Sequence, residues 1–124
     1  MTTSVVNRIH SEATRMDIHE LVARLNESVG TTVVQAMTGT KDRNRPREWA
    51  RAVDPRPEIE QRLRLGYRAW RTVEASDGPS VALAWLVGAN PRLGEGTPVT
   101  AIREQRADEV MAAASSFVED AHVA

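Results

Sequence analysis

Apolar residues recur at intervals of three and four through most of the chain, which is the repeat of one face of an α-helix. The clearest run follows Asp17 and consists of Ile18, Leu21, Val22, Leu25 and Val29. Asp17 and Glu20 have the spacing of a capping box at the start of that helix, and Gly30 ends it. No sustained alternation with a period of two lies between the turn residues, so we expect an all-α protein.

The first half of the chain has the size of a helix-turn-helix unit. A weak apolar pattern over residues 4–15 favours either a short helix capped by Ser4 or a frayed leader. After the helix that follows Asp17, we expect a second, short helix that is capped by Thr31 or Thr32 and ended by Gly39. A third helix is predicted next.

This third helix is predicted to begin after Asn44, because asparagine is a good N-cap and proline at position 46 is tolerated in a first helical turn. Trp49 is its large apolar residue and is expected to anchor the helix in the core.

Two prolines in the polar segment 53–57 predict a linker. We therefore divide the chain into a helix-turn-helix-like half, residues 1–54, and a second helical half, residues 55–124. The longest predicted helix follows the linker, over about residues 57–75. Its apolar face is formed by Ile59, Leu63, Gly66, Tyr67, Trp70 and Val73.

Residues 84–98 read AWLVGANPRLGEGTP and predict a compact loop between two packed helices. The preceding residues, 80–87, are apolar nearly all round and predict a buried helix. Gly88 suits a left-handed C-cap, and Asn90-Pro91 cannot continue a helix. Leu93 lies between two turn signals and is expected to pack back into the core, and Pro98 starts the next helix.

The formal net charge of −1 hides a division along the chain. Residues 41–71 contain ten basic and five acidic residues, a net charge of +5, whereas residues 72–124 contain three and eight, a net charge of −5. Much of the acidic excess of residues 72–124 lies on the last predicted helix, residues 106–121. Two partners of opposite character would explain this division, and solvated helix faces are the alternative.

Composition and motifs exclude several kinds of site. The chain has no cysteine, which removes disulfides and thiolate chemistry, and no apolar run approaches the ~20 residues of a membrane span. His10, His19 and His122 lack the spacing of metal ligands, and Gly94-Glu95-Gly96 is not a dinucleotide fingerprint. We expect a cytoplasmic protein with no metal, no cofactor and no catalytic activity.

Trp85-Leu86, the segment Asn90-Pro91-Arg92-Leu93-Gly94 and Pro98 together resemble the toxin-binding domain of the Xre/MbcA/ParS antitoxins. We expect these residues to serve mostly the fold and to identify the family without contacting the partner. The resemblance covers roughly residues 17–118 and implies an all-α protein with a helix-turn-helix-like half and a toxin-binding half. It also implies a homodimer. Apolar surface at Leu65 and Ala69 of the long helix is compatible with one.

The resemblance and the charge pattern together suggest two contact surfaces. Basic residues around the third helix are candidates for DNA backbone contact or a plain solvated face, and they are Lys41, Arg43, Arg45, Arg47 and Arg51. Pro46 and the arginine-rich loop depart from a typical recognition helix, which puts base reading in doubt. The candidates for toxin contact are Arg92, Glu95, Glu104, Asp108, Glu119 and Asp120.

The expected function is a type II antitoxin that binds and neutralises a co-encoded RES-domain toxin acting on NAD and represses its own operon by binding operator DNA. Two alternatives stay open: a transcriptional regulator without a toxin partner, and an adaptor whose first half has lost DNA binding.

Overall fold

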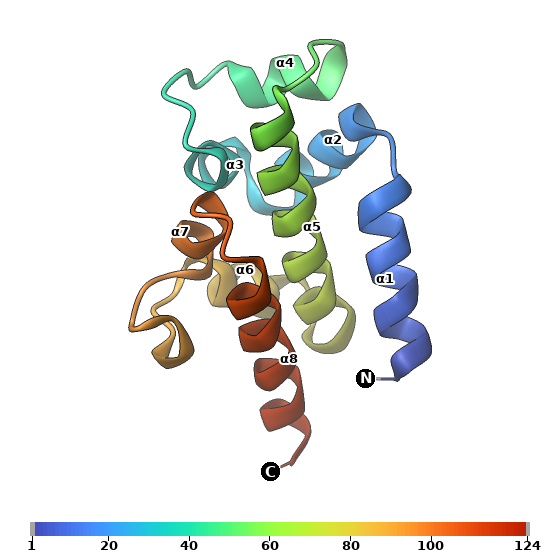
Figure 1. The fold of residues 1–124 in the computed structure, drawn as a ribbon, viewed down its shortest axis with the longest axis vertical. Coiled ribbons are helices and arrows are strands. Elements are labelled where there is room, and N and C mark those ends of the chain that lie inside the picture. Colours follow the sequence, from blue (N-terminus) through green and yellow to red (C-terminus); the bar gives the residue numbers. More distant parts are fainter. Residues whose placement is uncertain (1, 124) are drawn as a thin grey trace.

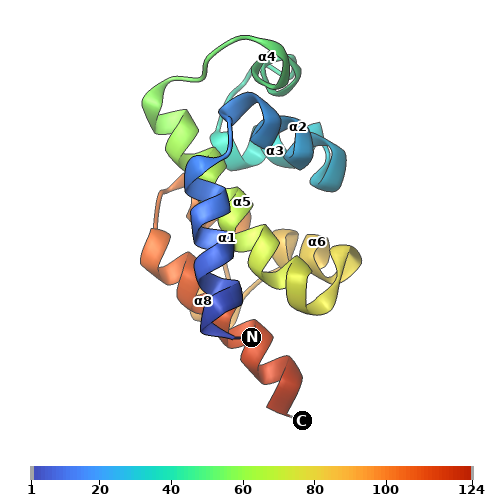
Figure 2. The ribbon, with the colours of Figure 1, turned by 90° about the vertical axis from the view of Figure 1, so that its right-hand side faces the viewer.

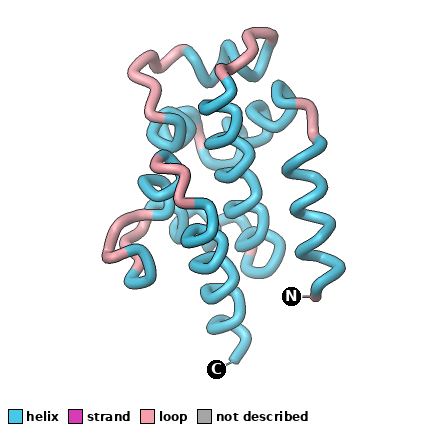
Figure 3. The backbone as a smooth tube through the Cα atoms, viewed as in Figure 1, coloured by secondary structure: helices cyan, strands magenta, loops and turns pink. Residues whose placement is uncertain are grey.

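The computed structural model describes residues 2–123, with side chains described for residues 2–120. Within that part the chain is all-α and contains no strand, as predicted (Figure 1 and Figure 3). A short 3-10 helix, η1, joins two of the α-helices. The elements in chain order are α1 Thr3–Arg15, α2 Ile18–Val29, α3 Thr31–Thr38, α4 Arg45–Arg51, α5 Pro57–Asp77, α6 Pro79–Val87, η1 Pro91–Leu93, α7 Pro98–Arg103 and α8 Ala107–Val123.

The long helix α5 forms the centre of the molecule. It packs against α1, α2, α3, α6, α7 and α8, so segments from both halves of the sequence meet on it (Figure 1 and Figure 2). Leu63, Tyr67 and Val73 are almost completely buried along its length. The buried apolar residues form one continuous cluster that runs from α1 to α8. The division at residues 54 and 55 stays a prediction, and Pro55 in the connecting segment is itself buried.

The contact between α3 and α5 is very close at Gly66. A Cβ placed there would lie 2.2 Å from Sδ and 2.7 Å from Cε of Met37, which is fully buried. Only a residue without a side chain allows the two helices to approach this closely.

Several predicted helix ends are confirmed and others are wrong. Asp17 caps α2, because its Oδ2 accepts a hydrogen bond from the backbone N–H of Glu20 at 3.1 Å. Thr2, and not Ser4, caps α1. Gly30 ends α2 and is also the N-cap of α3, so neither threonine that follows it is the cap.

The third predicted helix, α4, packs across α2. Trp49 is 5% exposed and anchors it in the core, as expected. Asn44 occupies the N-cap position of α4, although its side chain makes no capping hydrogen bond. The succession of α2, α3 and α4 matches the predicted helices, and their interpretation as a helix-turn-helix unit stays a prediction.

The second half corrects two expectations. Gly88 ends α6 in an extended conformation with φ of −90° and not in a left-handed one. A Cβ there would lie 2.9 Å from the carbonyl oxygen of Ala84, so the position favours glycine through crowding. Helix α6 is also buried on one side only, because Val81 and Val87 are 39% and 48% exposed.

Of the two residues of α5 expected to leave apolar surface, only one does. Ala69 is fully buried, whereas Leu65 is partly buried against the core and keeps part of its surface exposed. The homodimer itself stays a prediction.

Candidate functional site

The loop between α6 and α7 is closed by hydrogen bonds around Asn90. Its Oδ1 accepts from the N–H of Arg92 at 3.0 Å, and its backbone N–H donates to the carbonyl oxygen of Gly96 at 3.0 Å. Its carbonyl oxygen accepts from the N–H groups of Leu93 and Glu95. Asparagine in this place therefore shapes the whole loop.

The apolar residues of the same stretch hold the loop on the core. Leu93 is 4% exposed and packs into the core, as predicted, and Gly94 follows it with φ of 63°. Trp85 and Leu86 are buried, and the Trp85 ring lies beside Phe117 of α8 with a centroid distance of 6.4 Å. Pro98 is the first residue of α7, as predicted.

The residues predicted to contact a toxin lie in three places. Arg92 and Asp120 line one pocket of about 280 Å³ between η1 and α8, and Glu95 is exposed on the same loop. Glu119, although next to Asp120 in sequence, lines a different pocket beside α1 and α5.

Glu104 and Asp108 lie at the opposite end of α8. Asp108 is in its first turn, which places it about 18 Å along the axis from Asp120 at 1.5 Å per residue. Arg106 forms ion pairs with Glu104 at 3.3 Å and with Glu109, and the pairing with Arg106 lowers the pKa of the Glu109 carboxyl. The charge at this end of α8 is therefore partly neutralised within the chain.

The five basic residues predicted to contact DNA also differ in their surroundings. Arg45 pairs with Glu48 at 2.9 Å and with Asp42 at 3.7 Å, so its charge is balanced locally. Lys41 and Arg43 are exposed on the turn before α4. Arg47 and Arg51 lie one helical turn apart and line a shallow depression of about 390 Å³ against α2 and the start of α3.

His19 of α2 ties α4 and the following segment to the rest of the first half. Its Nδ1 lies 2.7 Å from the carbonyl oxygen of Trp49, and its Nε2 lies 3.0 Å from Oδ1 of Asp54. Both partners are acceptors, so the arrangement favours the doubly protonated ring. The bond to Trp49 and the nearby carboxylates of Asp17 and Asp54 raise the pKa of His19.

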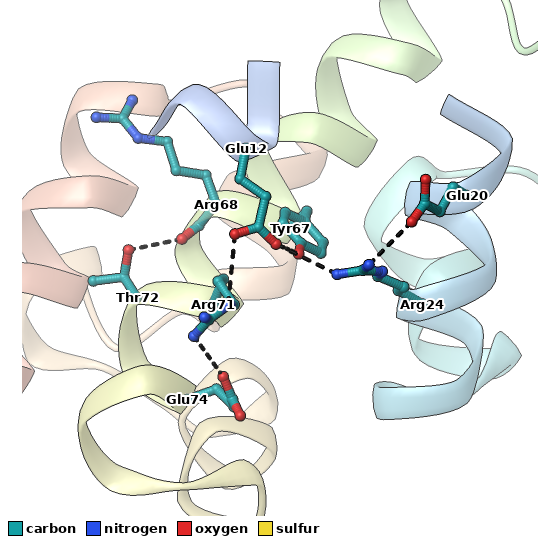
Figure 4. Close-up of polar contacts among 8 residues, drawn as sticks. All are labelled: Glu12, Glu20, Arg24, Tyr67, Arg68, Arg71, Thr72 and Glu74. Carbon is teal, nitrogen blue, oxygen red and sulfur yellow. Dashed lines mark hydrogen bonds and ion pairs between the residues drawn. The ribbon is translucent and has the colours of Figure 1, made fainter. Parts of the chain in front are cut away.

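A polar network between α1, α2 and α5 was missed by the sequence analysis (Figure 4). The Tyr67 hydroxyl donates to Oε1 of Glu12, and the same carboxylate lies 3.5 Å from Arg24 and 3.9 Å from Arg71. Burial and the hydrogen bond to Glu12 raise the pKa of Tyr67 to about 12.

This network fixes α1 to the body of the protein. Arg64 adds to it by donating to the carbonyl oxygens of Ala13 and Met16 at the end of α1, at 3.1 and 2.8 Å. The partners on α5 lie more than forty residues from those on α1, so spacing along the chain carries no signal for these contacts.

Among the described residues, no group of histidine and carboxylate side chains is arranged to hold a metal ion. The side chain of His122 lies outside the described part. The helices that the structure describes are all too short or too polar to span a bilayer.

Comparisons with protein-family models, with curated proteins and with solved structures give no match to this chain.

Proposed function

We propose that this protein is the antitoxin of a toxin–antitoxin pair, and that it binds and neutralises a co-encoded RES-domain toxin acting on NAD without chemistry of its own. The observation that carries the proposal is the stretch of residues 84–98, whose sequence resembles the toxin-binding domain of the Xre/MbcA/ParS antitoxins. Its loop is closed by Asn90 and held by Leu93, which leaves Arg92 and Glu95 exposed beside the C-terminal part of α8.

The loop and the end of α8 form the surface that we assign to the toxin. Arg92 and Asp120 share a pocket there with the edge of Phe117, which combines both signs of charge with an aromatic ring. Aromatic and arginine side chains often contribute most of the binding energy of protein interfaces. Glu104 and Asp108 lie too far away to belong to the same small contact.

The test is co-expression of this chain with the product of the adjacent gene, followed by affinity purification and measurement of cellular NAD. We expect a stable complex, and NAD loss only when this chain is absent. In the complex, Asp120→Ala should weaken neutralisation more than Asp108→Ala, because both are exposed aspartates on α8 and only the first lies at the loop. Absence of both complex and toxicity would refute the antitoxin proposal.

DNA binding through α4 is the second part of the proposal, with a homodimer on operator DNA. Arg47 and Arg51 lie on one face of α4 and form no ion pair within the described part of the chain, although Glu27 lines the same depression, whereas Arg45 is paired. Removing one arginine that contacts a phosphate should reduce the slope of log affinity against log salt by about 0.9. We therefore expect Arg47→Ala to flatten the salt dependence of binding to the upstream DNA, and Arg45→Ala to change it less.

A transcriptional regulator without a toxin is the second candidate, favoured by the exposed basic residues Lys41, Arg43, Arg47 and Arg51. Operator binding without any complex with the neighbouring gene product would support this candidate. A toxin complex without DNA binding would keep the antitoxin function and remove the operator, and the absence of both would leave the stand-alone adaptor.

A further inference from the structure

A pocket of about 350 Å³ opens where the end of α3, the helix α4 and the start of α5 meet. Its lining contains three arginines from separate segments: Arg45 of α4, Arg56 of the connecting segment and Arg62 of α5. Trp49 and Ile59 form its apolar wall. The sequence analysis counted Arg56 and Arg62 in the basic excess and gave neither of them a role.

The guanidinium of Arg62 is held in place at this pocket. Its Nη1 donates to the carbonyl oxygen of Thr38 at 2.7 Å, which orients the group against the end of α3. Its Nε is buried and has no hydrogen-bond partner among the described residues. A buried N–H without an acceptor costs free energy, and an oxygen bound beside the guanidinium would reduce that cost.

The charges left unbalanced in the pocket are mainly positive. Arg45 is paired with Glu48, and Asp54 is held by His19. Arg56 and Arg62 have no carboxylate within ion-pair distance in the described part of the chain, and Glu58 is the remaining acidic group of the lining.

The start of α5 adds a second source of positive potential. Arg56 is the N-cap of this helix of 21 residues and makes no capping hydrogen bond with its side chain. Pro57 is the first residue of the helix and has no N–H, and Glu58 and Glu60 of the first turn offset part of the positive helix dipole. The N–H groups of the residues that follow Pro57 lack partners within the helix and can still donate to an anion.

We propose that this pocket binds a phosphate group, with Arg56 and Arg62 as its cationic ligands. Guanidinium groups match the oxygens of phosphate with parallel hydrogen bonds, and two of them balance its double charge. The phosphate belongs either to a DNA backbone or to a small phosphorylated molecule. The proposal does not depend on the toxin partner.

The test is a titration of the full chain with inorganic phosphate, followed by NMR at constant ionic strength. We expect saturable shifts of the backbone amides of residues 56–62 and of the Arg62 Nε–H signal. Arg56→Ala should weaken the apparent affinity at least fivefold, and Arg56→Lys should restore part of it. Arg8→Ala removes an exposed arginine on α1 and should leave the titration unchanged.

Shifts that rise linearly without saturation, or equal affinity in Arg56→Ala and in Arg8→Ala, would overturn the proposal. Arg56 is exposed, so its replacement is not expected to unfold the chain, and circular dichroism checks this.

A duplex DNA of unrelated sequence then distinguishes the two sources. Displacement of phosphate from the pocket by this DNA assigns the site to a nucleic-acid backbone. Phosphate binding that the DNA leaves unchanged assigns the site to a small phosphorylated molecule. If Arg47→Ala loses DNA binding and keeps phosphate binding, the pocket and the surface proposed on α4 are two different sites.

Discussion

Replacement of Gly66 by alanine tests the close contact between α5 and the Met37 side chain of α3. The new Cβ would lie 2.2 Å from Sδ, 2.7 Å from Cε and 3.2 Å from Cγ of Met37. Carbon and sulfur atoms pack best at about 3.5–4.0 Å, so Met37 would have to move by about 1.5 Å. It is fully buried, and its neighbours leave little space for that movement.

The expected effect is a balance of two contributions. Overpacking of a core costs about 1–3 kcal/mol, and alanine gains about 1 kcal/mol over glycine inside a helix. Gly66→Ala alone should therefore lower the free energy of unfolding by up to about 2 kcal/mol. In a Met37→Ala background the clash is gone, and the same replacement should raise the free energy of unfolding by about 1 kcal/mol.

Urea denaturation of the four proteins in this cycle measures both effects, and the difference between the two backgrounds isolates the contact. Equal effects of Gly66→Ala with and without Met37 would refute the steric explanation. Stabilisation of the otherwise unchanged protein would refute it as well.

Three further predictions concern single polar contacts. His19 has a raised pKa in the folded protein, so its contribution to stability is complete below its ordinary pKa and is lost as the pH rises through the raised value. Melting temperatures measured from pH 5 to 8.5 should show this fall in stability. The variant His19→Gln should not show it. Tyr67→Phe should lower the free energy of unfolding in urea by about 1–2 kcal/mol, because Glu12 loses its hydroxyl donor. It should also speed amide exchange in α1, and unchanged exchange would contradict this role. Asn90→Ala should cost about 1 kcal/mol, since the N–H of Arg92 loses its acceptor, and a thermal melt identical to the parent would contradict that role.

The sequence contained the information for the helices and for much of the loop. Period and end signals located α2, α5 and α7 because an amphipathic helix repeats its apolar face and caps are local. Leu93 was identified as a core residue for a similar reason, since an isolated large apolar side chain in a short loop has few other places to pack.

What depends on distant parts of the chain could not be predicted. Ala69 was expected to leave apolar surface, but it is fully buried. Other helices pack on several sides of α5, and the sequence alone does not show how many neighbours a helix has. The glycine at position 88 is explained by the nearby carbonyl oxygen of Ala84 and not by a left-handed φ. Only coordinates distinguish these two explanations. Of the candidate site residues, the sequence could not show that Arg92 and Asp120 share a pocket. The pairing of Arg45 is different, because Asp42 and Glu48 are each only three residues away.

The position of α5 between the two halves has a consequence for how the protein opens. Six other helices cover this helix, so its amides are protected by partners from both ends of the sequence. No partial opening of one half alone exposes the whole of α5. Its central amides should therefore exchange with solvent deuterium only through global unfolding, whereas α1 and the end of α8, the first and last helices of the chain, should exchange through smaller and more frequent openings.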